Sequence, residues 1–268
     1  MATPALSFAF PLAAQVWLVQ MLAYHGFGLW FEWLDRAGRL SRFKTRPLER
    51  MSYGRMVPRV LANQLLVLLP AMLLMQWTGL AFVGRAHLSL LDWLVAAVAL
   101  PLGHDVVQYV AHRFILHRPD MMRRLGHALH HSTTGSRGIS ACYMSATDFF
   151  FEIVCPYLLP LALIGGGGSD IVFHTVMVVS GAFGGLYEHS GYDFSLGLRM
   201  SGGGRLRAAL AKMISSEAHA AHHVRGNVSF SDGFGSPSLC DTLFGTRFDL
   251  VPGRGGYAGS GRRANASA

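Results

Sequence analysis

One uncharged apolar run limits what this chain can fold into more than any other feature. Val60 to Val83 contains no charged residue and is long enough to cross the hydrocarbon core of a bilayer as a helix. The composition agrees, because 51% of the 268 residues are hydrophobic and only 14% are charged, whereas soluble domains have about 25% charged residues. The sequence therefore predicts a helical membrane protein.

Further apolar stretches bring the predicted number of membrane segments to four or five. They are Phe8 to Trp33, Leu88 to Tyr109, Phe149 to Ile164 and Ile171 to Tyr187. The last two are short and are joined by four glycines, so they could form either two spans or one re-entrant hairpin. We predict an all-α integral membrane fold of four or five transmembrane or re-entrant helices, with a histidine-rich helical cap on the cytoplasmic side.

The side of the membrane follows from the basic residues. The segment from Asp35 to Arg59 is strongly basic, carrying Arg36, Arg39, Arg42, Lys44, Arg46, Arg50, Arg55 and Arg59. The positive-inside rule places it in the cytoplasm, and counting spans from there brings every histidine cluster to the same face. We read the net charge of +8 as a sign of this topology and expect no nucleic-acid partner.

The rest of the layout is simple. We expect residues 1–250 to form a single membrane-embedded domain and residues 251–268, rich in Gly, Arg and Ala, to be a disordered tail. Arg205 to Ile214 has the pattern of an amphipathic helix lying at the membrane interface. The Ala-, Gly- and Arg-rich composition is typical of a bacterial source, so we expect an inner-membrane protein.

Histidines are concentrated in two matched motifs. His127, His130 and His131 have the spacing His-x-x-His-His, and His219, His222 and His223 repeat it about ninety residues later. Positions i, i+3 and i+4 share one face of a helix, so each triplet can converge on one point. The adjacent pair in each triplet lies about 100° apart around the helix, so its two rings could serve two neighbouring metal ions.

The ligand type narrows the chemistry. Imidazoles without thiolates disfavour iron–sulfur clusters and structural zinc, and the three cysteines form no Cys-x-x-Cys pair. Eight or more histidines exceed what one metal can use, so two metals are implied. Iron can change its oxidation state where zinc cannot, and an iron pair at a membrane face could activate dioxygen to attack an unactivated C–H bond. Two iron ions are therefore the predicted cofactor, with zinc as a possible substitute.

The ordered motifs resemble the fatty acid hydroxylase/sterol desaturase superfamily. The resemblance covers roughly Gly103 to Thr246 and rests on Asp105-x3-Tyr109-x2-His112-Arg113-x3-His117, His127-x2-His130-His131, Glu188-His189-Ser-Gly-Tyr-Asp-Phe194, His219-x2-His222-His223, Asn227 and Asp241-Thr-Leu-Phe-Gly-Thr246. The string from His189 to Phe194 is most similar to the C-4 methylsterol oxidase branch.

What the resemblance implies is an integral-membrane, non-haem di-iron oxygenase. Its ligands would correspond to His112, His117, His127, His130, His131, His189, His219, His222 and His223. Relatives often carry a further ligand four residues before the residue equivalent to His189, but this chain has Gly185 there. That coordination position is left to water, to His104, or to a nearby carboxylate such as Glu188.

Several other residues are candidates for supporting roles. Asp105 and Glu188 could orient ligand imidazoles through the second ring nitrogen, and Asp105 could equally be a buried partner of Arg113. Tyr109 could line the pocket or be an ordinary interfacial tyrosine. Asn227 could be a turn residue only. His25, His87 and His174 are predicted to be structural or solvated, and Asp241 to Thr246 to be a structural turn near the site.

The predicted activity is hydroxylation or further oxidation of a membrane lipid, sterol-like or fatty-acyl, with O2. The electrons must come from a ferredoxin, a cytochrome b5-like protein or a reductase, because the chain has no haem-binding His-Pro-Gly-Gly segment, no Rossmann glycine fingerprint and no cysteine cluster. A lipid desaturase using the same di-iron site is one alternative, and a non-catalytic membrane metal-binding protein is another. A di-haem cytochrome using His25, His104 and His174 would leave the clusters unexplained.

Overall fold

The chain folds into helices and loops. The computed structural model describes residues 10–200, 204–231 and 233–252, and within these ranges the only extended pairing is an isolated bridge between Lys44 and Tyr192. The α-helices are α1 (Leu12–Arg36), α2 (Tyr53–Asn63), α3 (Leu69–Trp77), α4 (Leu90–Val110), α5 (Met121–Arg124), α6 (His127–His130), α7 (Ala146–Phe149), α8 (Cys155–Leu163), α9 (Ile171–Glu188), α10 (Ser195–Met200), α11 (Arg205–Met213), α12 (Glu217–Arg225) and α13 (Leu239–Leu243).

Three short π-helical segments join some of these helices into longer ones. They are η2 (Gln64–Leu68) between α2 and α3, η3 (Ala111–Leu116) after α4, and η5 (Phe150–Val154) between α7 and α8. Single 3₁₀ turns lie at η1 (Ser41–Phe43) and η4 (Gly138–Cys142). A π segment inside an α-helix is rare and frequently marks a functional site.

Four of the resulting helices are long and apolar enough to cross a membrane. Among the described residues these are Tyr53–Trp77, Leu90–Leu116, Ala146–Leu163 and Ile171–Glu188. The predicted all-α membrane fold is thereby confirmed. Both members of the glycine-linked hairpin reach this length, which favours two spans over a re-entrant loop.

The predicted boundaries needed correction at several points. The run expected at Val60–Val83 begins earlier, at Tyr53, and ends at Trp77, so the last part of the basic segment is already helical. The helix expected to end near Tyr109 continues to Leu116 and carries His112 itself. The first expected span corresponds to α1, which contains Glu32 and Asp35 and is not among the four; Phe8 lies outside the described residues.

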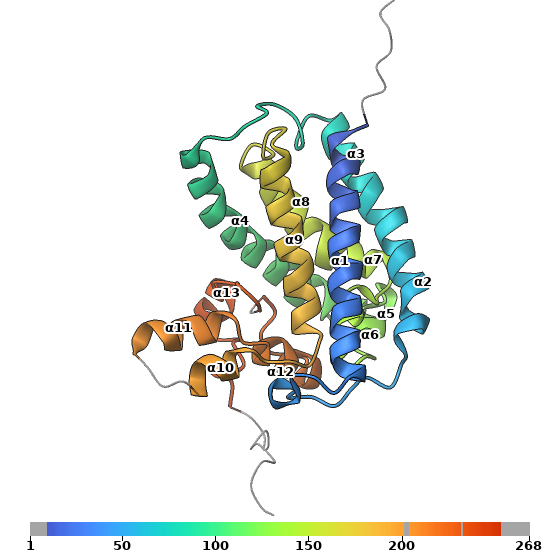
Figure 1. Cartoon of the computed structure of the whole chain (residues 1–268), viewed down its shortest axis with the longest axis vertical. Helices are drawn as coiled ribbons and strands as arrows, with labels where there is room; N and C mark the ends of the chain where they lie inside the picture. Colours follow the sequence, from blue (N-terminus) through green and yellow to red (C-terminus); the bar gives the residue numbers. More distant parts are fainter. Residues whose placement is uncertain (1–9, 201–203, 232, 253–268) are drawn as a thin grey trace, which may run out of the picture.

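The long helices stand side by side, and the short helices gather at one end (Figure 1). α1 packs along α9, and α4 packs against α8. Helices α10 to α13 lie at the end where α1 and α9 finish, as do α5 and α6 (Figure 1). Leucines such as Leu22, Leu66 and Leu90 remain exposed on the sides of the bundle, as expected for surfaces that contact lipid.

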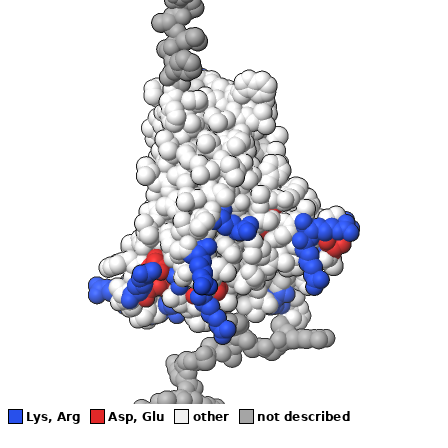
Figure 2. Space-filling view, turned by 90° about the vertical axis from the view of Figure 1, so that its right-hand side faces the viewer, with Lys and Arg blue, Asp and Glu red and all other residues white. Residues whose placement is uncertain are grey.

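Most of the charged side chains lie at the same end, although Arg85 and Asp92 form an ion pair at the opposite end. In the face shown in Figure 2 the Lys, Arg, Asp and Glu side chains form a band around the lower part, and the upper part is uncharged. Helix α11 belongs to this charged end, and it exposes Leu206, Leu210 and Met213 beside its basic residues. This agrees with the predicted interfacial helix. The predicted tail from Val251 lies almost wholly outside the described residues, and the single-domain boundaries stay a prediction.

The opposite end is closed by two loops that bind each other. The amide of Phe82 donates to the carbonyl of Gly166 at 3.1 Å, and the amide of Ser169 donates to the carbonyl of Arg85 at 2.8 Å. Asp170 accepts from the amide of Leu88 at 2.9 Å while also accepting from the amides of Val172 and Phe173 at the start of α9. The glycine turn between α8 and α9 is therefore fixed to the loop between α3 and α4, which sets how these two pairs of helices meet.

Gly166 is the position in this turn where a side chain should do most damage. A Cβ there would lie 2.5 Å from the carbonyl oxygen of Leu80, whereas a Cβ on Gly165 would meet nothing within 4 Å. Both residues have positive φ, so alanine costs about 1–2 kcal/mol at either position. We expect Gly166→Ala to lower the thermal unfolding midpoint of the detergent-solubilised protein more than Gly165→Ala does. Equal midpoints would contradict the close approach of the two loops.

Candidate metal centre

The structure brings all nine predicted ligand histidines together as two adjacent groups. The five-histidine group contains His112, His117, His127, His131 and His222, and the four-histidine group contains His130, His189, His219 and His223. Within each group the candidate ligand atoms lie within 4.8 Å of one another. The groups adjoin, since the ring centroids of His131 and His223 are 4.9 Å apart. The nine residues come from η3, α6, the end of α9 and α12, so the site lies where the long helices meet the charged end.

Each His-x-x-His-His triplet is divided between the two groups. His127 and His131 belong to the five-histidine group and His130 to the other, while His219 and His223 belong to the four-histidine group and His222 to the first. In both triplets the i and i+4 residues share one group because they lie on one helix face. The i+3 residue points to the neighbouring group. The predicted separation of the adjacent pairs is therefore present in the structure.

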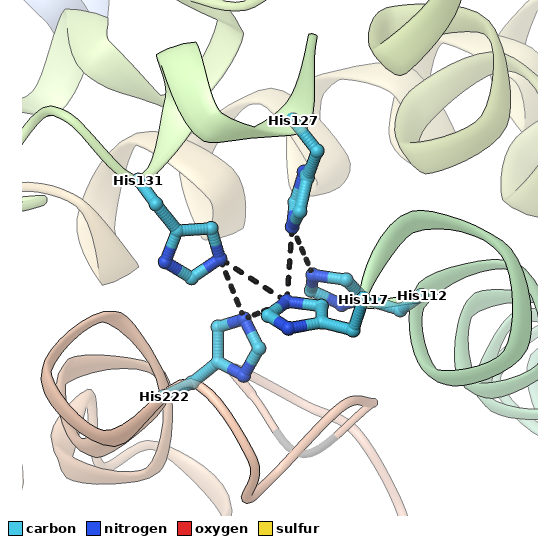
Figure 3. Close-up of side chains that lie close together, drawn as sticks. All are labelled: His112, His117, His127, His131 and His222. Carbon is cyan, nitrogen blue, oxygen red and sulfur yellow. Dashed lines mark hydrogen bonds between the residues drawn. The ribbon is translucent and has the colours of Figure 1, made fainter. Parts of the chain in front are cut away.

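A π turn explains how His112 and His117 reach the same group. Five residues apart on an ordinary α-helix, the two side chains would point about 140° away from each other. In η3 the amide of His117 instead donates to the carbonyl of His112, an i→i+5 bond of 2.9 Å. This wider turn brings the rings to the same side, with centroids 4.9 Å apart. Figure 3 shows both projecting from one helix toward His127, His131 and His222.

Backbone carbonyls and one carboxylate orient the imidazoles. Nδ1 donates from His112 to the carbonyl of Phe230 and from His222 to that of Val228, both at 2.8 Å. His189 Nδ1 donates to the carbonyl of Gly185 at 2.9 Å. His127 Nδ1 faces Asp148 Oδ1 at 2.9 Å. A carbonyl or carboxylate can only accept, so in each case a proton sits on Nδ1, and Nε2 is the nitrogen that can bind a metal when the ring is neutral.

The Nε2 atoms of the histidines in each group face one another, as they would around a shared cation. Nε2 of His117 lies 3.0 Å from that of His127 and 3.1 Å from that of His222, as drawn in Figure 3. In the second group, His219 Nε2 lies 2.9 Å from His189 Nε2. Imidazoles bound to a first-row metal at about 2.0–2.1 Å lie roughly 3 to 3.5 Å apart. Both groups fit a bound metal ion, and the nitrogen ligands suit iron, zinc or copper.

The surroundings keep most of these rings neutral. Burial, aided by neighbouring imidazoles, lowers the pKa of His117 and of His131 to about 2. Burial lowers the pKa of His189 to about 3. The pKa values of His130, His219, His222 and His223 are also well below the usual value, for the same two reasons. Neutral imidazole is the form that binds a metal.

The comparison with known protein families agrees with this geometry. A family model described as fatty acid hydroxylase matches residues 97–246. The chain belongs to the fatty acid hydroxylase family. The matched region begins within α4 and ends just after α13, so it contains every histidine of both groups. No curated protein and no solved structure matches the chain.

Two carboxylates beside the hydroxylase-family histidines were missed in the sequence. Asp148 and Glu152 are buried, four residues apart in α7 and η5, and with His127 they form a third potential metal-binding group. The available signal was their position, because acidic residues within a transmembrane segment are rare and by default functional. Burial lowers the pKa of His127, but hydrogen bonds to Asp148 and Glu152 outweigh it and raise the pKa to about 9.

Asp105 has a different role from both of those predicted. Its carboxylate accepts from the amides of Leu239 and Cys240 at 3.0 and 2.9 Å, at the start of α13. It also accepts from the hydroxyls of Ser231 and Ser236. The prediction that it orients a ligand or pairs with Arg113 is therefore wrong. Asp105 anchors the segment that follows Phe230, whose carbonyl orients His112.

Two further predicted residues, Tyr109 and Asn227, lie near the groups without joining them. Tyr109 is buried and stacks on Phe244, and its hydroxyl accepts from Arg113 and lies 3.3 Å from Thr246 Oγ1. It holds the turn from Asp241 to Thr246 against α4, which is consistent with the structural turn expected there. Asn227 is exposed in the bend after α12.

The residues considered for the coordination position left open by Gly185 belong to neither histidine group. The carboxylate of Glu188 accepts from the amide of Phe234, and His104 is exposed on α4 and belongs to neither group. Gly185 contributes its carbonyl to His189. His25 and His174, two of the histidines that a di-haem cytochrome would need, contact Gln64 Oε1 and the carbonyl of Gly168 respectively. His87 is exposed.

The basic segment from Asp35 to Arg59 is bonded to the loops that carry two of the histidines. Lys44 Nζ donates to Asp35 at 2.5 Å and to the carbonyl of Ser190 at 2.7 Å. Arg46 is buried, and its guanidinium donates to the carbonyls of Glu188 and Thr134 at 2.6 and 3.3 Å. These bonds join the basic segment to the residues on either side of His189 and to the loop that follows His131.

The division into two groups predicts the metal content of single variants. His222→Ala should remove the metal of the five-histidine group, and His219→Ala that of the four-histidine group, so each should reduce about two metals per chain to about one. His174→Ala is the control, because His174 lies at the far end of α9 and should keep both. Elemental analysis of the purified proteins provides the measurement. Loss of both metals in His174→Ala would mean that the centre is elsewhere.

The raised pKa of His127 predicts proton release on metal loading. Below pH 9 the metal-free ring carries a proton at Nε2, which must leave before that nitrogen can bind, whereas Nδ1–H stays with Asp148. In His219→Ala, which keeps the five-histidine group, adding Zn²⁺ at pH 7.5 should release about one proton per metal from the site, and Asp148→Asn should release less. The measurement is the change of a pH indicator in weak buffer. The absence of proton release would mean that His127 is neutral.

Proposed function

We propose that this chain is a membrane-bound di-iron oxygenase that hydroxylates, or further oxidises, an unactivated C–H bond of a membrane lipid. The observation that carries the proposal is the pair of adjacent histidine groups, whose nine rings converge at the ends of helices long enough to cross a membrane. The fatty acid hydroxylase family gives the reaction class. Two neighbouring metals bound mainly by neutral nitrogen suit the two-electron chemistry that dioxygen requires.

The balance of the reaction defines what the chain must receive. Hydroxylation converts R–H, O2, two electrons and two protons into R–OH and water. Iron ions bound at the two groups would supply dioxygen activation and oxidation of the C–H bond. The electrons would come from a separate carrier such as a ferredoxin, a cytochrome b5-like protein or a reductase. The charged end of the molecule is the face on which such a soluble carrier would dock (Figure 2).

The chain's own residues hold the metals in place and keep the centre dry. Carbonyls of Phe230, Val228 and Gly185 fix the tautomers of His112, His222 and His189, so each Nε2 is ready to bind. His127 and His130 are completely buried, which limits the access of bulk water to the metals.

The location of the site is part of the proposal. The basic segment from Asp35 to Arg59 and both histidine groups lie at one end of the bundle, so the positive-inside rule places the centre on the cytoplasmic face of a bacterial inner membrane. A lipid substrate would reach it from the side of the bundle, since apolar residues such as Val110 and Phe114 are exposed near the end of the helix Leu90–Leu116.

The first test combines the metal and the lipids. The purified protein should contain about two irons per chain, and cells that express it should gain lipids carrying one extra oxygen derived from ¹⁸O2. His130→Ala should lower product formation by at least about a hundredfold while the protein still inserts into the membrane. His174→Ala should have a much milder effect.

The outcomes separate the alternatives. Lipids that lose two hydrogens without gaining oxygen would assign the same site to a desaturase. Zinc or exchangeable metal with an unchanged lipidome would favour a non-catalytic metal-binding protein. Normal turnover in His130→Ala would overturn the assignment of the four-histidine group to the active centre.

A further inference from the structure

The two metal-binding groups differ in the number of histidines. One has five imidazoles and the other four. Gly185 lies one turn before His189 on α9. It has no side chain, and its carbonyl orients His189, so it supplies no ligand to the four-histidine group. A fifth protein ligand for this group must therefore come from another element.

Glu152 presents a carboxylate to this group from η5. Its Oε1 lies 3.6 Å from Nε2 of His130, and that nitrogen is the metal-facing one because it lies 3.2 Å from Nε2 of His189. Two oxygen or nitrogen ligands of one metal lie roughly 3 to 3.5 Å apart. The carboxylate oxygen is therefore close to the spacing that ligands of one ion adopt.

The surroundings of Glu152 leave its carboxylate in need of a cation. The residue is 6% exposed and lies in an apolar span whose one other charged residue is Asp148. The nearest group to its Oε2 is Nδ1 of His127 at 3.4 Å, and that nitrogen already donates to Asp148, so Oε2 has no full hydrogen bond of its own. Burying a carboxylate is strongly unfavourable unless it is well paired or binds a metal, and this shared contact satisfies it only in part.

Asp148 shows that Glu152 is not needed to orient His127. Asp148 Oδ1 already accepts from His127 Nδ1 at 2.9 Å, and one proton on Nδ1 supports one short bond of that kind. Glu152 is thus a second carboxylate beside a ring that already has its acceptor. Of the two acids, only Glu152 contacts a histidine of the four-histidine group.

We propose that Glu152 is the fifth protein ligand of the metal held by His130, His189, His219 and His223. The inference rests on the proposed metal centre and deepens it. One metal would have five neutral nitrogen ligands, and the other four nitrogens and one anionic oxygen. Carboxylate oxygen is a harder ligand than imidazole, so the two ions would be chemically different. For ions of the same oxidation state, the site with Glu152 would carry one unit less net positive charge, counted over the ion and its ligands.

Single-site variants allow the proposal to be tested with Co²⁺ as the probe. His222→Ala isolates the four-histidine group, and His219→Ala isolates the five-histidine group. Glu152→Gln is introduced into each background of the full chain in detergent, and Co²⁺ affinity is measured by competition with a chelator. The ligand-field absorption spectrum of the bound Co²⁺ gives a second readout that depends on the ligand set. Neither readout depends on turnover.

The expected pattern is specific to one group. In the His222→Ala background, Glu152→Gln should weaken Co²⁺ binding about tenfold or more and change its absorption spectrum. In the His219→Ala background it should have a much smaller effect. Asp148→Asn is the matched control, because Asp148 lies one turn away and its histidine contact is His127 of the five-histidine group. Its effect on Co²⁺ binding should therefore be larger in the His219→Ala background than in the His222→Ala background.

Two results would overturn the proposal. Unchanged Co²⁺ affinity and spectrum in the His222→Ala background would show that Glu152 is not a ligand. An effect confined to the His219→Ala background would show that Glu152 acts through His127. Glu152→Leu, which fits the apolar span, provides a second variant if the glutamine variant does not fold. Failure of the proposed function is distinguishable, because it would appear as an unchanged lipidome, whereas the Co²⁺ affinity and spectrum are measured without turnover.

Discussion

The structure is organised around nine imidazoles whose ring nitrogens lie close together in two adjacent groups. Where Nδ1 is held by a carbonyl or carboxylate, Nε2 has no proton to share, and it faces another nitrogen at about the distance that a metal would impose. A proton on His127 can satisfy one such contact but not the rest. The surrounding fold must therefore hold these buried nitrogens at the distances that a shared cation favours.

The rest of the chain can be understood as the means of maintaining this arrangement. The long helices bring His112, Glu152 and His189 together around His127 and His130. The basic segment then ties the two loops that carry His131 and His189 through Lys44 and Arg46. Asp241 accepts from the amides of Phe230 and Ser231, next to the carbonyl that orients His112, and Asp105 accepts from the amides of Leu239 and Cys240.

Much of the site could be predicted because its signal is local. The His-x-x-His-His spacing follows from helix periodicity, and it correctly separated His130 from His131 and His222 from His223. The helical membrane fold was equally accessible from composition. The position of His117 relative to His112 was harder, because a π turn leaves no pattern of side chains in the sequence. Asp105 was misjudged since its partners lie more than a hundred residues away, and a carboxylate near histidines was taken to belong to them.

The π turn at η3 has a consequence for how this helix can change. Such a turn holds one residue more than the α-helical turn that it replaces, while the helix before it keeps its direction and its neighbours. Before the π turn, the helix decides which side chains of α4 pack against α8. After it, the extra residue changes which side chains face the histidine groups, and the two parts of one continuous helix are thus oriented separately. An insertion at this point could have rotated His117 toward the centre without disturbing the bundle. The same helix can therefore diverge at its lipid-facing part and at its catalytic end separately.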